Sequence, residues 1–295
     1  MAPISMRAER NTIPLFLKRV PGAAVTVLLL AWAVVQVYPI IFMFITSVKT
    51  DKQILNAPFA LPDPLKFENY AIVWQGDRVA QPFSTFFINS FIITLGSLLI
   101  LLFVAGLAGY SLARGRFPGN AATQQMFLLT LAVPVHVLII PMYFFMGDLG
   151  LRNNHVGMML VYATLGLPFT IILMRAYFLS FPHELEEAAL LDGCSRFGAF
   201  IRVVVPVSRG AIASMAIINI SWIWSELFFA LVLLDQPQVR TLPLAVAGYR
   251  PVSMAAESVV GQQFAIMTLT ALPLFVFYFL FQRQIRRGMT AGALR

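Results

Sequence analysis

Long apolar stretches dominate the chain and alternate with short polar segments. Six stretches are long enough to form spanning helices, because about 20 apolar residues cross roughly 30 Å of hydrocarbon. They cover residues 21–45, 84–112, 122–146, 155–179, 210–234 and 263–282. None shows the alternation of a β-strand, so the pattern predicts an all-α membrane protein with six transmembrane helices.

The composition supports a polytopic membrane protein. Of the 295 residues, 59% are hydrophobic and 12% are charged, about half the charged fraction of soluble proteins. The net charge of +8 could indicate nucleic-acid binding, but the basic residues are scattered among the loops without forming a patch. The apolar run after Arg19 is longer than the core of a signal peptide, so we expect an uncleaved first span.

The distribution of Lys and Arg predicts the orientation. With the N-terminus inside, fourteen of the 21 Lys and Arg residues lie in inner segments, as the positive-inside rule requires. Both termini are therefore expected in the cytoplasm, together with the loop 180–208 and a tail over 283–295. The outer segments 48–83 and 235–262 are rich in Pro, Asp, Asn and Gln, and we expect ordered loops with short helices there. The whole chain, 1–295, is expected to form one transmembrane domain.

Several predicted spans contain residues that bend helices or bring them close together. Prolines within a span predict kinks, which are tolerated in packed interiors or along a water-lined path. They are Pro39, Pro134, Pro141, Pro168 and Pro273. Ala105 and Gly109 have the small-xxx-small spacing that indicates close helix packing.

The cytoplasmic loop begins with a cluster of acids. Four of them fall within nine residues, namely Glu184, Glu186, Glu187 and Asp192. Pro182 suits the first turn of a helix, and acids near that end favour the positive end of the helix dipole. Gly193 can end the helix in a left-handed conformation. We therefore predict a short helix that presents small alanines and carboxylates outward.

A second short helix is predicted after this glycine. Phe197, Phe200, Ile201 and Val204 have the spacing of one apolar helix face, and Pro206 would close the helix before the next span. A loop resting on lipid headgroups would usually carry a basic face, and a solvated connector rarely has helix formers on both sides of a bend. A docking surface for a cytoplasmic partner fits this segment better.

The spacing in this loop resembles the EAA loop of permease subunits of bacterial ATP-binding-cassette (ABC) importers. In that pattern, E-A-A is followed after three residues by G, and after nine more by I-x-L-P. Glu187-Ala188-Ala189, Gly193 and Val203-Val204-Val205-Pro206 keep every spacing, with valines in place of the usual isoleucine and leucine. Other stretches are similar to the carbohydrate-importer branch, especially the smaller maltose-type permease: "FENYAIVW" (Phe67–Trp74), "AGYSLARGRFPG" (Ala108–Gly119), "TLPLAV" (Thr241–Val246) and "RGMTAGAL" (Arg287–Leu294).

The resemblance implies a type I, maltose-like permease in the bacterial cytoplasmic membrane that forms half of a sugar translocation path. Its partners would be a second permease, expected to be non-identical, two cytoplasmic ATPases and an extracytoplasmic binding protein. The EAA loop would be the coupling helix that fits a cleft of the ATPase. The implied coupling residues are Glu186, Glu187, Ala188, Ala189, Asp192, Gly193 and Pro206.

The end of the chain resembles the tail that is thought, in that family, to reach into the ATPase dimer. The matching residues are Gly288, Met289, Thr290, Ala291 and Gly292. The alternative is a basic anchor at the inner leaflet.

The ATPase itself is absent from this sequence. None of the four lysines follows a glycine, so the chain has no G-x-x-x-x-G-K-[ST] motif. We expect ATP and Mg²⁺ to be bound by the partner ATPase and no cofactor by this chain. The sequence also has no cluster with metal-ligand spacing and no set of nucleophile and base, so a transport subunit is expected and not an enzyme.

Polar residues within the spans are weaker candidates. Glu226 lies in the fifth span, where a charge costs around 2.5–3.5 kcal/mol on insertion scales and should face a cavity or a partner. It could line the sugar path or fix the packing of the span by a hydrogen bond. The other candidates for the path are Asn219, Trp222, Ser225 and His136, each of which could equally serve packing.

Two alternatives to a sugar importer remain open. An importer permease of the same superfamily could carry amino acids, phosphate or polyamines. A secondary transporter would work alone, and should show coupling-ion acids or an inverted repeat in its spans. We find neither in this sequence.

Overall fold

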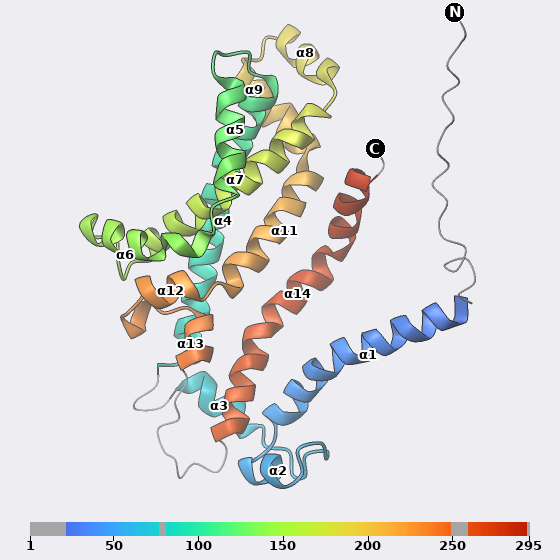
Figure 1. Ribbon diagram of the computed structural model, residues 1–295, viewed down its shortest axis with the longest axis vertical. Helices are drawn as coiled ribbons and strands as arrows, with labels where there is room; N and C mark the ends of the chain where they lie inside the picture. Colours follow the sequence, from blue (N-terminus) through green and yellow to red (C-terminus); the bar gives the residue numbers. More distant parts are fainter. Residues whose placement is uncertain (1–21, 77–80, 249–258, 294–295) are drawn as a thin grey trace, which may run out of the picture.

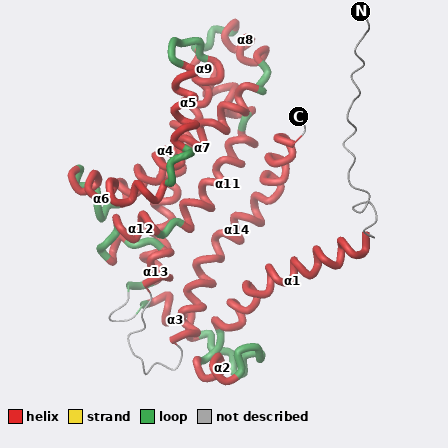
Figure 2. The backbone as a smooth tube through the Cα atoms, in the orientation of Figure 1, coloured by secondary structure: helices red, strands yellow, loops and turns green. Residues whose placement is uncertain are grey.

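Every regular element is helical in this computed structural model, which describes residues 22–76, 81–248 and 259–293. Figure 1 and Figure 2 show the arrangement of these helices. Four helices contain stretches long and apolar enough to cross a membrane. They are α1 (Gly22–Ser47), α4 (Phe83–Arg114), α7 (His155–Leu179) and α14 (Val259–Ala293). The all-α prediction is confirmed for the described residues.

The third expected span, 122–146, is not a single helix. It is divided into α5 (Asn120–Thr130) and a second part made of the 3₁₀ turn η2 (Val135–Leu138) and α6 (Ile139–Asp148). The two parts are bent by 90°. Pro134 lies at this break, because proline lacks an N–H group and its ring clashes with the preceding turn.

The fifth expected span, 210–234, is also interrupted. Helix α11 (Arg209–Ser225) ends before Glu226 and Leu227, and the short helix α12 (Phe228–Leu233) follows. At its other end, α11 is bent by 77° from the helical stretch 196–207. By length and composition, the described part of the chain contains four candidate spans, or up to six if each bent pair counts as one.

Helices α4 and α7 form the centre of the fold. Helix α11 packs against both of them, and α14 packs against α11 (Figure 1). A Cβ atom at Gly109 would lie only 2.8 Å from Met174 Cβ and 3.0 Å from the backbone nitrogen of Arg175. The close helix packing predicted for Ala105 and Gly109 is therefore confirmed. Helix α1 packs mainly against α14 and diverges from the rest of the molecule.

The two expected outer segments contain short helices, as predicted. The first includes α2 (Asp51–Asn56) and α3 (Glu68–Gln75), and the second includes the 3₁₀ turn η4 (Pro237–Val239) and α13 (Leu242–Gly248). Thr50 caps α2 through a capping box with Gln53, which satisfies two backbone N–H groups at the helix start.

Hydrogen bonds join α2 to the start of α14, and α3 to the end of α1. The Asp51 carboxylate accepts from the backbone N–H groups of Val260 and Gly261 at 2.8 and 3.2 Å. The Asn69 amide donates to the carbonyl oxygens of Ser47 and Lys49 at 2.9 and 3.0 Å.

The Lys49 side chain lies within this junction and is 1% exposed. Its Nζ donates to the carbonyl oxygens of Ala57 and Pro58 at 3.4 and 2.8 Å. Burial lowers the pKa of the Lys49 amine from its ordinary value of 10.5, because desolvation disfavours the charged form.

Candidate functional site

The acidic segment, which is the expected loop 180–208 with its cluster of acids, lies at the end of the molecule opposite α2 and α3 (Figure 1). Its first helix, α8 (His183–Leu191), begins directly after Pro182 and has Glu184 and Glu186 in its first turn. Gly193 follows with a φ of +85°, a left-handed conformation that glycine adopts without a steric penalty. The N–H of Cys194 donates to the carbonyl of Ala189 at 3.0 Å. The predicted helix and glycine bend are both confirmed.

The second helix of the segment is irregular. It consists of α9 (Arg196–Ala199), the π turn η3 (Phe200–Val204) and α10 (Val205–Val207). Pro206 does not close the helix as expected, since helical residues continue through Val207 before the bend into α11. A proline cannot complete an ordinary α-turn, and a π turn before it accommodates the missing bond.

The single apolar face predicted for this helix is wrong in half of its positions. Phe200 and Val204 are buried, whereas Phe197 and Ile201 are 59% and 41% exposed. The π turn, in which the N–H of Val205 bonds to the carbonyl of Phe200, interrupts the regular spacing that the prediction assumed. Because this turn contains more residues than an α-turn, side chains before and after it no longer share one face.

The first helix presents only part of the expected surface outward. Glu187 and Ala188 are exposed, and so are Asp192 and Gly193 beyond them. Glu186 and Ala189 are instead buried, contrary to the outward orientation that we expected for the carboxylates and alanines. Helix α8 packs one of its faces against the rest of the molecule. Glu186 and Ala189 are three residues apart and therefore lie on this same inward face.

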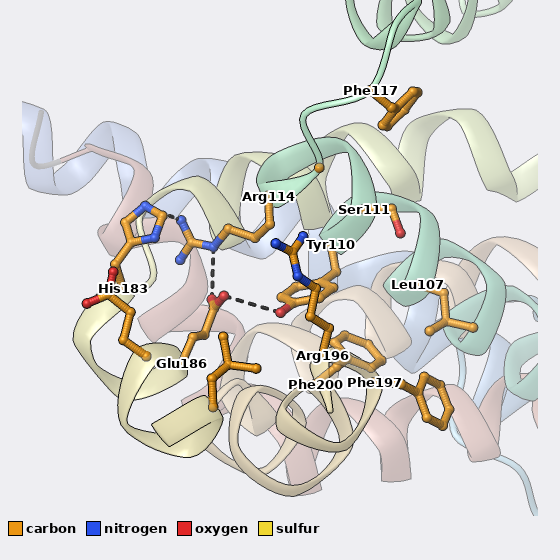
Figure 3. A pocket seen from close by; sticks show the side chains of 13 residues that line it. Leu107, Tyr110, Ser111, Arg114, Phe117, His183, Glu186, Arg196, Phe197 and Phe200 are labelled. Atoms are coloured by element: carbon orange, nitrogen blue, oxygen red, sulfur yellow. Dashed lines mark hydrogen bonds and ion pairs between the residues drawn. The ribbon is translucent and has the colours of Figure 1, made fainter. Parts of the chain in front are cut away.

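Glu186 is buried because α4 supplies its partners (Figure 3). Arg114 Nε lies 2.8 Å from Glu186 Oε1, and the two side chains are 9% and 10% exposed. The Tyr110 hydroxyl donates to Glu186 Oε2 at 3.2 Å. A buried carboxylate with a cation and a hydroxyl as partners is compensated, whereas an isolated one would be strongly disfavoured.

Arg114 holds the start of α8 through two further contacts. Its Nη2 donates to the carbonyl of Phe181 at 2.6 Å, and its Nη1 lies 2.7 Å from His183 Nε2. A guanidinium has no acceptor, so the imidazole must be the acceptor. Sequence reasoning gave Arg114 no role beyond its positive charge. Two signals were available: its place at the end of a span on the side expected for the acidic loop, and its place within the family-like stretch "AGYSLARGRFPG" (Ala108–Gly119).

A cleft of about 510 Å³ lies between the end of α4 and the acidic segment. Its lining combines apolar side chains, among them Phe197 and Phe200, with the ion pair, Glu187 and Arg196. Arg196 and Tyr110 both line this cleft (Figure 3). The cleft thus adjoins the exposed part of α8.

The candidate residues of the tail, Gly288, Met289, Thr290, Ala291 and Gly292, lie outside the residues whose side chains the structure describes. Their backbone continues α14, which extends through Ala293. The sixth expected span, 263–282, and the expected tail as far as Ala293 therefore belong to one helix, which begins four residues earlier than predicted, at Val259.

Glu226 stabilises the break between α11 and α12. It is 8% exposed, and its Oε2 accepts from the Tyr162 hydroxyl of α7 at 2.6 Å. The N–H groups of Phe229 and Ala230 donate to Oε1 and Oε2 at 3.0 and 3.3 Å. These N–H groups lie in the first turn of α12 and have no partner within the helix, so the carboxylate caps it.

The other polar candidates of the spans are only partly brought together. Trp222 packs edge-on against Tyr162, with ring centroids 5.8 Å apart, and is thereby linked to Glu226. His136 is exposed and lies edge-on to Phe228, at 5.0 Å between centroids.

Asn219 and Ser225 make local or packing hydrogen bonds. The buried Asn219 amide donates to Thr170 Oγ1 of α7 at 3.1 Å and to the Met215 carbonyl at 2.9 Å. Ser225 is exposed and donates to the Ser221 carbonyl of its own helix at 2.8 Å. Asn219 therefore joins α11 to α7 at a place separate from Glu226.

Comparison with known proteins gives consistent results. Residues 72–291 match the family model described as "Binding-protein-dependent transport system inner membrane component". The chain is 32% identical over 268 residues to the diacetylchitobiose uptake system permease protein NgcG of Streptomyces coelicolor, covering 91% of this chain and 87% of that protein. It is 31% identical over 257 residues to the trehalose transport system permease protein SugB of Mycobacterium tuberculosis, covering 87% and 92%.

A solved structure shares the fold along nearly the whole chain. It is a crystal structure of a bacterial ABC transporter involved in the import of the acidic polysaccharide alginate. The TM-score is 0.80 at 26% sequence identity, and the alignment covers 96% of this chain and 99% of the matched chain.

Proposed function

Because this chain belongs to the family of binding-protein-dependent transport system inner membrane components, and is thus a multi-pass permease of an ABC importer, we propose that its solute is a carbohydrate. The relatives named for diacetylchitobiose and trehalose uptake support this choice. So does the structural similarity to a transporter of a polysaccharide. The alternatives, a permease for amino acids, phosphate or polyamines, have no comparable support.

The proposed topology has six membrane crossings with both termini in the cytoplasm. Each bent pair would then form one broken crossing. The acidic segment would lie on the cytoplasmic side, where the loops together carry the excess of Lys and Arg. The partners would be a second permease, two ATPases that bind ATP and Mg²⁺, and a binding protein outside the membrane. Helix α8 and the bend at Gly193 would form the coupling segment, defined here as residues 183–207.

The exposed part of α8 is the proposed contact with the ATPase. Glu187 and Ala188 offer a carboxylate for a basic residue and a small side chain that allows close approach. Asp192 and Gly193 continue this surface at the bend. Glu186 and Ala189 would act from within the permease, since both are buried. Pro206 would shape the helix near its junction with α11.

A role in the sugar path is proposed for residues with free polar or aromatic surface. Trp222 has a half-buried ring, and Ser225 and His136 are exposed. Asn219 and Glu226 remain weaker candidates, because their polar atoms already have partners within the chain. Stacking on Trp222 would be the contact most suited to a sugar ring.

The match of residues 72–291 to the family carries this proposal. We expect the tagged chain to co-purify with an ATPase and to support ATP-dependent uptake of labelled diacetylchitobiose or trehalose in vesicles that also contain the partner permease and the binding protein. Labelled leucine serves as the competing class of solute. Uptake of leucine in place of both sugars would refute the carbohydrate assignment.

The coupling surface is tested by charge reversal. Glu187→Lys should lower sugar uptake at least about tenfold, because like charges at an interface cost several kcal/mol. Glu184→Lys, an exposed position on the same helix outside the EAA pattern, is the matched control. Uptake at the normal rate by the Glu187→Lys transporter would contradict the proposed contact.

A further inference from the structure

The coupling segment is attached to a helix that is remote from it in sequence. Glu186 and Arg114 are separated by 72 residues, and their ion pair joins α8 to the last residue of α4. Arg114 also bonds to the Phe181 carbonyl and contacts His183, so one guanidinium holds three points at the start of α8 (Figure 3). This planar group can satisfy several acceptors at once, which a single ammonium cannot do.

A second residue of α4 holds the other half of the coupling segment. The Tyr110 ring lies 4.8 Å from that of Phe200 in η3 and stands perpendicular to that of Phe178 in α7 at 5.9 Å. Tyr110 and Arg114 are four residues apart and therefore lie on the same face of α4. The end of α4 thus contacts both helices of the coupling segment, one through polar groups and one through aromatic rings.

Helix α4 is packed so closely against α7 that it can transmit a displacement along its length. Besides the contact at Gly109, a Cβ atom at Gly166 of α7 would lie 2.8 Å from Leu101 Cδ2. The 32 residues of α4 span about 48 Å at 1.5 Å per residue. Close-packed helices shift as units and do not deform continuously.

The opposite end of α4 is hydrogen-bonded to the second outer segment. The Asn89 amide donates to the carbonyls of Gln238 and Arg240 at 2.7 and 3.0 Å. The Ser90 hydroxyl accepts from the N–H of Leu242 at 2.8 Å. Helix α4 therefore has long-range polar attachments at both ends, one to the coupling segment and one to the outer segment around η4 and α13.

We infer that Arg114 is a positioning residue, which binds the coupling segment to α4 through Glu186 so that a displacement of this segment reaches the outer side of the permease. This inference rests on the proposed function of the coupling segment. It assigns Glu186 to the interior of the permease and leaves contact with the ATPase to Glu187. A purely structural anchor would stabilise α8 without affecting the response of α4 to nucleotide.

The test follows the outer end of α4 in the complete transporter, reconstituted in nanodiscs with its ATPase. The lone Cys194 is replaced by serine, and Ser84→Cys places one thiol in the first turn of α4. Its reaction rate with a membrane-impermeant maleimide is compared between the nucleotide-free state and the state trapped with MgATP and vanadate. We expect the two rates to differ when Arg114 is intact.

Arg114→Gln should reduce this difference at least about fivefold, the lower end of typical coupling between sites, while the ATPase remains bound. Arg116→Gln, an exposed arginine two residues further on, should leave the difference unchanged. The double variant Arg114→Gln/Glu186→Gln should be no worse than either single variant, because residues that act as one unit are not additive. If Arg114→Gln does not accumulate, Arg114→Lys, which retains the charge but not the three-point contact, should give an intermediate response.

Three results would overturn the inference. The first is an unchanged nucleotide response in Arg114→Gln, and the second is equal loss in Arg114→Gln and Arg116→Gln. The third is a wild-type transporter that traps nucleotide but shows no response at position 84. Failure of the wild-type chain to retain an ATPase at all would refute the proposed function itself, and is recognised by co-purification before any labelling.

Discussion

Two glutamates with the same exposure, Glu186 and Glu226, are held in different ways. Each is 8% exposed. Glu186 forms an ion pair with Arg114 across two helices that are distant in sequence. Glu226 has no cation among the partners that the structure gives it, and accepts from a tyrosine hydroxyl and two backbone N–H groups.

The difference reflects what each carboxylate joins. The ion pair of Glu186 connects two helices that are distant in sequence, and either partner is costly to leave alone. The bonds of Glu226 satisfy the first turn of a helix a few residues away, so they fix a local break in the fifth span. A buried acid can thus link two helices or cap the start of one, and only its hydrogen-bonding partners distinguish these two roles.

The largest effect should follow from leaving Arg114 without its carboxylate. Glu186→Ala should lower the free energy of unfolding by about 3–5 kcal/mol, because an uncompensated buried charge remains. Thermal unfolding of the purified transporter in detergent measures the change. Glu184→Ala, which removes an exposed acid from the same helix, should change it by less than about 0.5 kcal/mol. Equal effects of the two variants would contradict the buried ion pair.

Replacement by glutamine separates the two sites. Glu226→Ala should cost about 2–4 kcal/mol, since it removes a helix cap and leaves the Tyr162 hydroxyl buried without a partner. Glu226→Gln should recover more than half of this loss, because an amide oxygen still accepts from neutral donors. Glu186→Gln should recover little, because an amide cannot neutralise Arg114. Thermal unfolding of the Ala and Gln variants at both positions measures these differences. Equal recovery by glutamine at Glu186 and Glu226 would show that the two carboxylates are not held differently.

The two tyrosines offer a finer comparison. Tyr162→Phe should cost about 1–2 kcal/mol, because a buried carboxylate loses its closest donor. Tyr110→Phe should cost less, since Arg114 remains bonded to Glu186 and the ring contacts with Phe200 are retained. A greater loss in Tyr110→Phe would show that the hydroxyl, and not the guanidinium, dominates at Glu186.

The smallest effect concerns Lys49, a buried cation whose hydrogen bonds go to carbonyls. Its pKa is lowered by burial, so the folded chain gives up this proton at a lower pH than the unfolded chain. Between the lowered pKa and about 10.5 the unfolded state binds more protons, and stability rises with pH. Lys49→Met should remove this contribution, so thermal stability measured at pH 8 and pH 10 should differ less in the variant. If the pH dependence of stability were the same in Lys49→Met and the wild-type chain, the contribution assigned to Lys49 would be contradicted.

Several features follow directly from local sequence. The fourth expected span coincides with α7 at 155–179, because a continuous apolar run between the Asn154 cap and Ser180 allows only a helix. Gly193 adopts the predicted left-handed bend. The kink predicted at Pro134 is present as a 90° break between α5 and the turn η2. The break at Glu226 was not predicted, because counting apolar residues measures the length of a span and not its continuity. The π turn before Pro206 was not predicted either, because the spacing of apolar residues was interpreted as that of a regular α-helix.

The sequence alone determined the class of the protein, its apolar spans, and the acidic helix with its glycine bend. These depend on residue type and short-range spacing, which are complete within a few turns of the chain. The tertiary structure decided which of two neighbouring acids faces outward. Glu186 and Glu187 are chemically identical, and only the arrival of Tyr110 and Arg114 from α4 makes burial of Glu186 favourable. Partners this distant in sequence leave no local pattern, because their proximity arises from the packing of α4 against α7.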